Sequence, residues 1–538
     1  MFMIAENSLI SNLLEYVGSI MRMLLVTGII AEGYVRREAE ILSKLTGYKV
    51  DVLTLRLPVA ALASTNYIAE ALLRANVRDY DIVIIPGLAR GSASIISERM
   101  GIPCVKGPKH FADISKILST MKIEKLSGEI PADMIYEGEV SNEISQTFSM
   151  IEKSIVDQMF IIAGKVKIPL RPPPIRVISE ITEAHLYDRN KLLQEIIKRV
   201  EAGADIVSVG FDASNPMPDL VYSTIRFIKE NYDVPIAVDS MAISEIKAGI
   251  NAGSDMILNL DAGTISDISS IPGSVAVVLI PTNMKENFVP RSVDERLKLI
   301  DYLLSKAREK KIENVIIDPI IEPPINPGLL TGLETAIELK KRKILPMMIG
   351  ISNVTEMIDA DSVGINALLT VLAYELGVSA VLVVEKSHKA KGSTREVVTA
   401  SKMVTLAHVR RTYPKDLGVN LLILKEKSDK TVPINVDSST EIFSEHGFGH
   451  TNLDPQGFFK IGLDRDRGLI IAVYQGRKGS ITIKGATADA VAKKIIDLGL
   501  ISRLDHAAYI GMELQKAETA LRLNKSYVQD ESLPLTAF

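Results

Sequence analysis

The sequence has very little cysteine, since Cys104 is the only one among 538 residues. A single thiol excludes a disulfide within the chain and any metal site built from several cysteines, which fits a reducing compartment such as the cytoplasm. An excess of positive charge is also missing, because the net charge is −4 and the pI is about 6.1. Nucleic acid and anionic membranes are therefore not the expected partners, and a small, chemically specific ligand is the better expectation.

Long uninterrupted apolar runs are absent as well. The first 22 residues carry Glu6 and Glu15 and lack a basic start, so we expect neither a signal peptide nor a membrane span there. The sequence contains no complete GxGxxG after its first strand pattern, no P-loop and no Asp-x-His-x-x-Gly cobalamin signature. What remains is a globular chain, 47% hydrophobic and 24% charged, whose length predicts two to four domains.

The first of these domains is expected at residues 23–120. Four apolar runs, "MLLVTG", "KVDVLTLRL", "DIVIIPGLA" and "IPCVKG", alternate there with helical stretches. Strands without polar alternation, spaced by helices, predict a parallel sheet covered on both faces, so we interpret this region as a Rossmann-like α/β domain. Glycines at the strand ends, such as Gly28 and Gly87, either admit a ligand to the backbone or are ordinary turn residues.

Two further regions flank the middle of the chain. Residues 121–174 have the pattern of a charged helical connector, helical to about Lys167 and ending in "PLRPPP". Three consecutive prolines continue neither a helix nor a central strand, so we expect a stiff linker and a domain boundary. Residues 413–538 predict a separate α+β module, with a hairpin in "DPQGFFKIGLDRDRGLIIAVYQG" and an amphipathic helix in "LDHAAYIGMELQKAETAL".

The clearest pattern lies at residues 175–412, where eight strand-like runs alternate with amphipathic helices. The runs are "RVISEIT", "DIVSVGF", "PIAVDS", "DMILNLD", "VAVVLI", "VIIDPI", "MMIGIS" and "AVLVVE". Eight β/α units in about 235 residues match the usual size of a closed (β/α)8 TIM barrel, although an open doubly wound sheet also uses eight strands. The predicted fold is therefore α/β: a TIM barrel between a Rossmann-like domain and an α+β module.

Polar residues at the carboxyl ends of these strands are the candidate site, because that end of a barrel carries the active site. Asp239, Asn259, Asp318 and Asn353 stand at the tips of strands three, four, six and seven. Such a group of carboxylates and amides is costly to bury without partners, so a ligand with several donors is expected. Taken singly, Asp239 or Ser352 could equally cap the helix that follows it.

These residues carry a resemblance to a known family. "EAGADIVSVGFDAS", "VPIAVDSM", "AGSDMILNL" and "VIIDP" resemble the pterin-binding barrel shared by dihydropteroate synthases and methyltetrahydrofolate:corrinoid methyltransferases. The whole chain is similar to archaeal proteins described as dihydropteroate synthase-related. The resemblance implies a cytoplasmic protein of folate or methanopterin one-carbon metabolism that binds a reduced pterin, of the tetrahydrofolate or tetrahydromethanopterin type, and that forms a homodimer through its barrel.

The resemblance also implies roles for individual residues. Asp239, Asn259 and Asp318 would clamp the pterin, and a carboxylate such as Asp318 suits the adjacent 2-amino and N3–H donors. The stretch "GISNV" looks like the Ser-Asn-Val of the methyltransferases, which places Ser352 and Asn353 against the pterin and makes Asn353 the catalytic residue beside N5.

Departures from the synthase pattern favour the methyltransferase branch. Where the synthases have an Asn, an Arg and an Arg-x-His, this sequence has Glu180, Asn215, Val383 and Glu385. Because like charges repel at short range, a diphosphate site has little reason to gain carboxylates. We therefore expect transfer of a methyl group at N5, with a corrinoid or another acceptor supplied by a partner protein. The alternatives are a diverged synthase-type condensation of a pterin with an arylamine, and a non-catalytic pterin carrier or sensor.

One basic segment and three histidines complete the candidates. The loop "KSHKAKGSTREV" sets Lys386, Lys389 and Lys391 before a helix that begins near Ser393. It either binds the anionic tail of the pterin or is a solvated lysine-rich loop. Glycines between His446 and His450 argue against a metal site, and His506 is expected to pack or to cap a helix.

Overall fold

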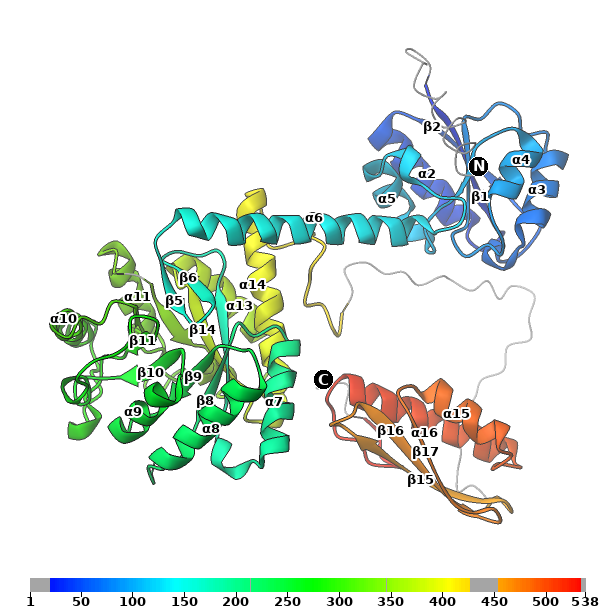
Figure 1. Cartoon of the computed structure of the whole chain (residues 1–538). Helices are drawn as coiled ribbons and strands as arrows, with labels where there is room; N and C mark the ends of the chain where they lie inside the picture. Colours follow the sequence, from blue (N-terminus) through cyan, green and yellow to red (C-terminus); the bar gives the residue numbers. More distant parts are fainter. Residues whose placement is uncertain (1–19, 213, 345, 426–452, 534–538) are drawn as a thin grey trace.

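The computed structural model describes residues 20–212, 214–344, 346–425 and 453–533. Figure 1 shows an N-terminal α/β domain, a long helix, a barrel and a C-terminal module following one another along the chain. Among the described helices, none is long and apolar enough to cross a membrane.

The N-terminal domain is built on a four-stranded parallel sheet. Its strands are β1 (Arg22–Thr27), β2 (Lys49–Thr54), β3 (Ile82–Ile85) and β4 (Cys104–Lys106), in the order β2-β1-β3-β4. Helices α2 (Glu32–Thr46), α3 (Thr65–Arg74), α4 (Ser94–Met100) and α5 (Ile114–Thr120) cover both faces. Successive residues of β1 enter two different cores, with Leu24 and Val26 in one and Met23 and Leu25 in the other. The predicted doubly covered parallel sheet is confirmed.

The connector differs in part from the prediction. Helix α6 (Ala132–Ser154) is present, but it ends well before Lys167, and residues 160–169 form an antiparallel hairpin of β5 (Phe160–Ala163) and β6 (Val166–Pro169). Gly164 takes a φ of +58° in the turn between them, a conformation that glycine adopts readily. Ile161, Ala163 and Ile168 pack into the interior of the barrel, and this tertiary burial outweighs the helical pattern of the charged segment.

Eight parallel strands form the barrel that the sequence predicts. The strands are β7 (Arg176–Ile181), β8 (Ile206–Gly210), β9 (Ile236–Asp239), β10 (Met256–Leu260), β11 (Ala276–Leu279), β12 (Val315–Ile317), β13 (Met348–Gly350) and β14 (Ala380–Val384). Their order is β12-β11-β10-β9-β8-β7-β14-β13, and a parallel bridge between Ile317 and Met347 joins the two ends of the sheet. The sheet is therefore closed, and the alternative of an open doubly wound sheet is wrong.

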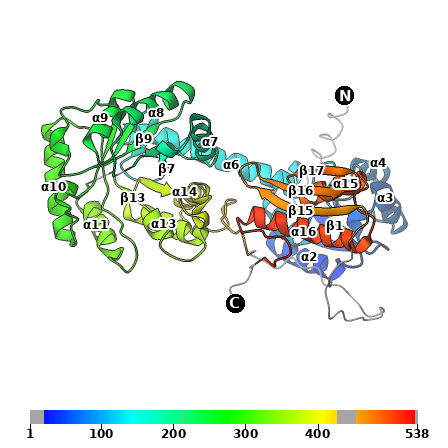
Figure 2. The same ribbon diagram turned by 90° about the horizontal axis from the view of Figure 1, so that it is seen from below.

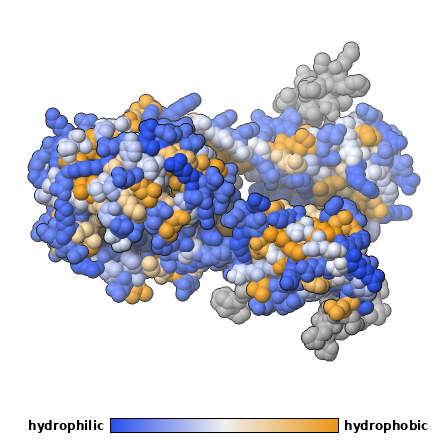
Figure 3. Space-filling view, turned by 60° about the horizontal axis from the view of Figure 1, so that its bottom comes forward, coloured by the Kyte–Doolittle hydropathy of each residue, from blue (hydrophilic) through white to orange (hydrophobic). Residues whose placement is uncertain are grey.

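Side chains alternate between the interior of the barrel and the surrounding helices. Ile178 and Ile206 belong to the interior cluster, whereas Val177 and Val207 pack outward. The outer layer consists of α7 (Arg189–Glu201), α8 (Pro218–Asn231), α9 (Ile243–Ala252), α10 (Val293–Glu309), α11 (Leu330–Lys341), α12 (Ser352–Thr355), α13 (Ser362–Leu376) and α14 (Ser393–Arg410). On the face of the molecule that Figure 3 shows, the surface of the barrel is mostly hydrophilic, with smaller apolar areas among the polar ones. Because the interior is filled by apolar residues, ligands are limited to the ends of the strands.

The C-terminal module has an antiparallel sheet covered on one face by two helices (Figure 2). Strands β15 (Gly457–Asp464), β16 (Leu469–Gly476) and β17 (Gly479–Gly485) pack on α15 (Ala488–Asp497) and α16 (Leu504–Arg522). The predicted hairpin is confirmed, with one further strand. His506 is buried and its Nδ1 lies 3.0 Å from Asp454 Oδ2, so it is a packed residue, as expected. The module contacts the barrel through Asn524, whose Nδ2 donates to the His388 carbonyl at 2.8 Å.

Candidate functional site

Two of the predicted site residues are joined directly at neighbouring strand tips. Asp239 ends β9, and Asn259 lies on β10, where it donates a hydrogen bond from Nδ2 to Asp239 Oδ1. Asn259 has a φ of +66°, and the pairing of β10 with β11 shifts register between Ile257 and Leu260. A left-handed residue within a strand is costly and typical of functional sites. The irregular backbone aims the amide at the carboxylate.

Asp318 follows β12 and is held by an unusually built loop. Asp318 is 9% exposed, and its carboxyl group accepts a hydrogen bond of 2.8 Å from the backbone of Ile320. Ile320 itself has a φ of +63°, which is rare for a β-branched residue. Arg296, fully buried, donates to the carbonyls of Pro319 at 2.9 Å and of Ile320 at 2.6 Å. It also pairs with Glu322, so the loop is fixed from beneath.

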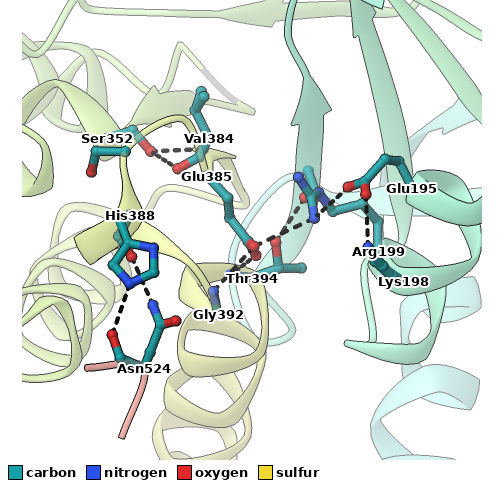
Figure 4. A network of polar contacts seen from close by, with 12 residues as sticks. Glu195, Lys198, Arg199, Ser352, Val384, Glu385, His388, Gly392, Thr394 and Asn524 are labelled. Atoms are coloured by element: carbon teal, nitrogen blue, oxygen red, sulfur yellow. Dashed lines mark hydrogen bonds and ion pairs between the residues drawn. The ribbon is translucent and has the colours of Figure 1, made fainter. Parts of the chain in front are cut away.

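Ser352 and Asn353, the two polar residues at the tip of the seventh strand, make different contacts. Ser352 Oγ accepts from the Val384 backbone at 2.7 Å and so links the tips of β13 and β14 (Figure 4). Asn353 is exposed and donates from Nδ2 to the carbonyl of Ile321 at 2.8 Å. This bond ties Asn353 to the Asp318 loop and leaves the amide oxygen as an acceptor.

A cavity of about 160 Å³ opens at the tips of the first three strands. Glu180, expected at the tip of the first barrel strand but given no binding role, lines this cavity beside Asp239. Gly210 leaves room for it, because a Cβ there would lie 2.6 Å from Glu180 Oε1, a close approach that only the three-dimensional structure shows. The lining consists of Glu180, Gly210, Phe211, Asp239, Ser240, Met241, Ala242 and Glu245.

Burial raises the proton affinity of three carboxyl groups at the strand tips. It raises the pKa of Asp318 to about 6, against the opposing effects of the Ile320 backbone hydrogen bond and the charge of Arg296. It also raises the pKa of Asp239 to about 6. For Glu180, burial and then the charge of Asp239 raise the pKa to about 8. Carboxyl groups that titrate close to neutral pH are typical of sites that exchange protons with a ligand.

Glu385 occupies the amino end of helix α14 (Figure 4). Its two carboxylate oxygens accept from the backbone of Gly392 at 3.1 Å and of Thr394 at 3.0 Å, and Arg199 lies 3.4 Å away. The amino end of a helix attracts anions, and here a carboxylate of the chain already fills that position.

The predicted anionic-tail residues do not converge on one point. Lys386 and Lys391 are exposed, whereas the Lys389 ammonium donates to the carbonyl of Ile358. Ser393 is buried, and its hydroxyl has no hydrogen-bond partner within the described ranges. No group of three or more histidine, cysteine, aspartate and glutamate side chains in the described parts of the chain could hold a metal ion. His446 and His450 lie outside those parts.

Comparisons with protein families match three segments of the chain. Residues 179–384 match the family described as "Pterin binding enzyme". Residues 453–530 match PterinBD-DUF4346, and residues 21–109 match a "Family of unknown function (DUF6513)". The first match covers most of the barrel, and the other two fall on the outer domains.

Among individual proteins, the chain is 34% identical over 530 residues to "Uncharacterized protein MJ0107" of Methanocaldococcus jannaschii, covering 96% of this chain and 99% of that one. A dihydropteroate synthase of Streptococcus pyogenes serotype M1 is 30% identical over 82 residues, which cover 14% of this chain and 31% of the synthase. The dihydropteroate synthase structure of Yersinia pestis with a pterine-sulfa conjugate aligns with 47% of this chain and 100% of its own, at 16% identity and a TM-score of 0.36.

Proposed function

We propose that this protein transfers a methyl group at N5 of a reduced pterin. The proposal starts from two findings: the chain belongs to the same family as the M. jannaschii protein, and its barrel is a pterin-binding domain related to dihydropteroate synthase. The pterin is of the tetrahydrofolate or tetrahydromethanopterin type.

The main support for methyl transfer over condensation is the negative charge of the carboxyl groups at the strand tips. Glu385 fills the amino end of α14, and Glu180 faces the cavity beside Asp239. A condensation that displaces diphosphate would bring at least two negative charges toward these carboxyl groups, which is unfavourable at short range. Transfer of a methyl group from a neutral amine nitrogen brings no such charge.

The binding roles follow from the donors and acceptors at the tips. Asp318 accepts from the 2-amino group and N3–H of the pterin, a donor pair with the spacing of a carboxylate. Asp239 and Asn259, already joined to each other, face the remaining edge of the ring. Asn353 keeps an amide oxygen that can orient the pterin beside N5, because its amide nitrogen donates to the Ile321 carbonyl.

The methyl acceptor comes from a partner. The chain has no Asp-x-His-x-x-Gly cobalamin signature, so a corrinoid protein or another protein with a strong nucleophile supplies it. Such a partner would dock over the strand tips, where the cavity opens.

A second candidate is synthase-type condensation of a pterin with an arylamine. It is favoured by the similarity to the S. pyogenes dihydropteroate synthase, whose matched segment covers 31% of that enzyme. It requires a diphosphate position that does not use the amino end of α14, because Glu385 holds that position.

Calorimetric titration of the full chain tests the proposal. The ligands are 5-methyltetrahydrofolate, tetrahydrofolate and hydroxymethyl-dihydropterin diphosphate, and the variants are Asp318→Asn and, as an off-site control on α10, Asp301→Asn. Tighter binding of the methylated ligand, lost by at least tenfold in Asp318→Asn and kept in Asp301→Asn, supports methyl transfer. Preferred binding of the diphosphate supports the condensation instead, and a wild-type chain that binds no pterin sinks both.

A further inference from the structure

We propose that Glu180 is the acid of this site, which donates its proton to N5 of the pterin as the methyl group leaves. The inference rests on the proposed pterin chemistry and adds to it the source of the proton. Glu180 has no assigned role in the pterin clamp formed by Asp239, Asn259 and Asp318.

The position of Glu180 places its carboxyl group at the reacting end of the barrel. Glu180 is the penultimate residue of β7 and pairs with Ser208 on one side and Val384 on the other. Residues two apart in a strand share a face, so Glu180 lies on the same side as Ile178, which packs inside the barrel. Its carboxyl group therefore stands above the apolar interior, in the cavity that it lines with Asp239.

The neighbouring backbone makes room for this carboxyl group. A Cβ on Gly210, the last residue of β8, would lie 2.6 Å from Glu180 Oε1. Directly across from Glu180, the Ser208 hydroxyl is buried and has no hydrogen-bond partner in the described part of the chain. Within the same part of the chain, no protein donor lies within hydrogen-bonding distance of the Glu180 carboxyl group either. A ligand group is thus free to take that position.

The surroundings of Glu180 keep its proton bound near neutral pH. Burial is the largest influence, the charge of Asp239 on β9 is the second, and Lys386 after β14 opposes both, with a resulting pKa of about 8. Glu245 on α9 also lines the cavity, but it is engaged by Ser240 Oγ at 2.5 Å and by the Met217 backbone at 2.7 Å. By contrast, Asp239 and Asp318 each accept a hydrogen bond that favours their charged form. Glu180 is therefore the carboxyl group that holds a proton at pH 7, as a general acid must.

The proton transfer balances the proposed reaction. The nucleophile of the acceptor protein forms a bond to the methyl carbon, and the bond from that carbon to N5 breaks and leaves its electron pair on N5. The O–H bond of Glu180 then breaks, an N5–H bond forms, and Glu180 remains as a carboxylate. Water returns the proton from solvent before the next methylated pterin binds.

Opposite pH dependences of two ligands are the signature of this role. The methylated pterin presents a lone pair at N5 and needs protonated Glu180, whereas the demethylated pterin presents N5–H and suits the carboxylate. In the wild type, the Kd of 5-methyltetrahydrofolate should rise by up to about tenfold per pH unit above pH 8, while tetrahydrofolate should bind more tightly over the same range. The experiment is calorimetric titration of the full chain with both ligands from pH 6 to 9.5.

Three variants distinguish the effect of the Glu180 proton on ligand binding from the effect of the shape of the site. Glu180→Gln, a permanent donor, should bind 5-methyltetrahydrofolate within about threefold of the wild type at pH 7 and lose the pH dependence of that binding. Glu180→Asp should keep a pH dependence with a displaced midpoint. Gly210→Ala, which pushes the carboxyl group aside, should weaken the binding of both ligands.

Several outcomes overturn the inference. An unchanged pH profile in Glu180→Gln means that another group holds the proton. Failure of folded Glu180→Gln to bind either ligand makes Glu180 a binding residue and not the acid. Failure of the wild type to bind any pterin is separable from both, because it removes the proposed function before Glu180 is tested.

Discussion

Asn259 donates a hydrogen bond to Asp239 across the tips of two neighbouring strands. The two residues are 20 positions apart in the sequence, and the bond depends on the left-handed backbone of Asn259. The amide thereby shields one oxygen of a largely buried carboxylate and fixes the direction of the other. The proposed pterin clamp is thus preorganised in part before any ligand binds.

Two substitutions can distinguish the contribution of the left-handed backbone of Asn259 from that of its side-chain amide. Asn259→Gly and Asn259→Ala both remove the amide, and both should lose pterin affinity. Only alanine retains the steric penalty at a φ of +66°, so Asn259→Ala should be less stable than Asn259→Gly by about 1 kcal/mol. Urea denaturation of the two variants measures the difference. Equal stabilities would mean that the backbone at this position is not strained.

The buried ion pair of Arg296 with Glu322 should be essential for the Asp318 loop. Arg296→Met leaves Glu322 with only the more exposed Arg291 at 3.3 Å, and the loss of stability should be roughly 3 kcal/mol. The double variant Arg296→Met/Glu322→Gln should recover part of that loss, because it no longer buries an unpaired charge. Chemical denaturation measures both. A double variant as unstable as the single one would show that the carbonyl contacts of Arg296 matter more than its charge.

The fold was predictable from local patterns, whereas the fine structure of the site was not. Apolar runs without polar alternation defined the strands of the parallel sheets, and their spacing defined the barrel. The hairpin at residues 160–169 was missed because its burial comes from strands distant in the sequence. Arg296 was missed for a similar reason: on α10 its position has no special pattern, and its partners Pro319, Ile320 and Glu322 come from the loop after β12.

For the strand-tip residues, the identities were predictable from the sequence but the hydrogen-bond partners were not. Ser352 and Asn353 are adjacent, and nothing in "GISNV" indicates that one links two strands while the other contacts the sixth strand's loop. From the sequence, Glu385 was interpreted only as a negative charge that would repel diphosphate. Its contacts with the amides of Gly392 and Thr394 depend on the three-dimensional path of the loop, which the sequence pattern does not show.

Barrel stability should fall as the pH rises. Burial raises the folded-state pKa of Asp318 from the ordinary 3.8 to about 6, so its contribution is fully present below pH 3.8 and is lost as the pH rises through 6. The linked free energy of unfolding is on the order of 3 kcal/mol. Asp318→Asn, which cannot ionise, should therefore gain stability relative to the wild type between pH 4 and pH 7. Thermal unfolding at each pH measures this, and parallel curves for the two proteins would contradict it.

Removal of Glu385 should create an anion site. Glu385→Ala frees the amides of Gly392 and Thr394 together with Arg199, so inorganic phosphate at millimolar concentration should raise the Tm of this variant and not that of the wild type. Glu195→Ala is the matched control, because Glu195 lies 3.6 Å from Arg199 and does not contact the amides. A response of both variants would assign the effect to Arg199 alone.

Cys104 should report on the N-terminal domain alone. It is buried in one core of that domain, and burial raises the pKa of its thiol to about 12. Alkylation at pH 8 should therefore be slow in the native chain and should follow opening of this domain. The rate of iodoacetamide labelling in increasing urea measures this. Rapid labelling without denaturant would show that the strand β4 is accessible.

Helix α6 acts as a spacer between the N-terminal domain and the barrel. Its first turn enters the core of the N-terminal domain through Ala132, and its later part meets α14 through Phe148 and through the pair of Glu143 with Arg410 at 2.9 Å. Twenty-three residues make it about 35 Å long. Because the helix is packed against folded structure at both ends, its length sets the spacing between the N-terminal domain and the barrel.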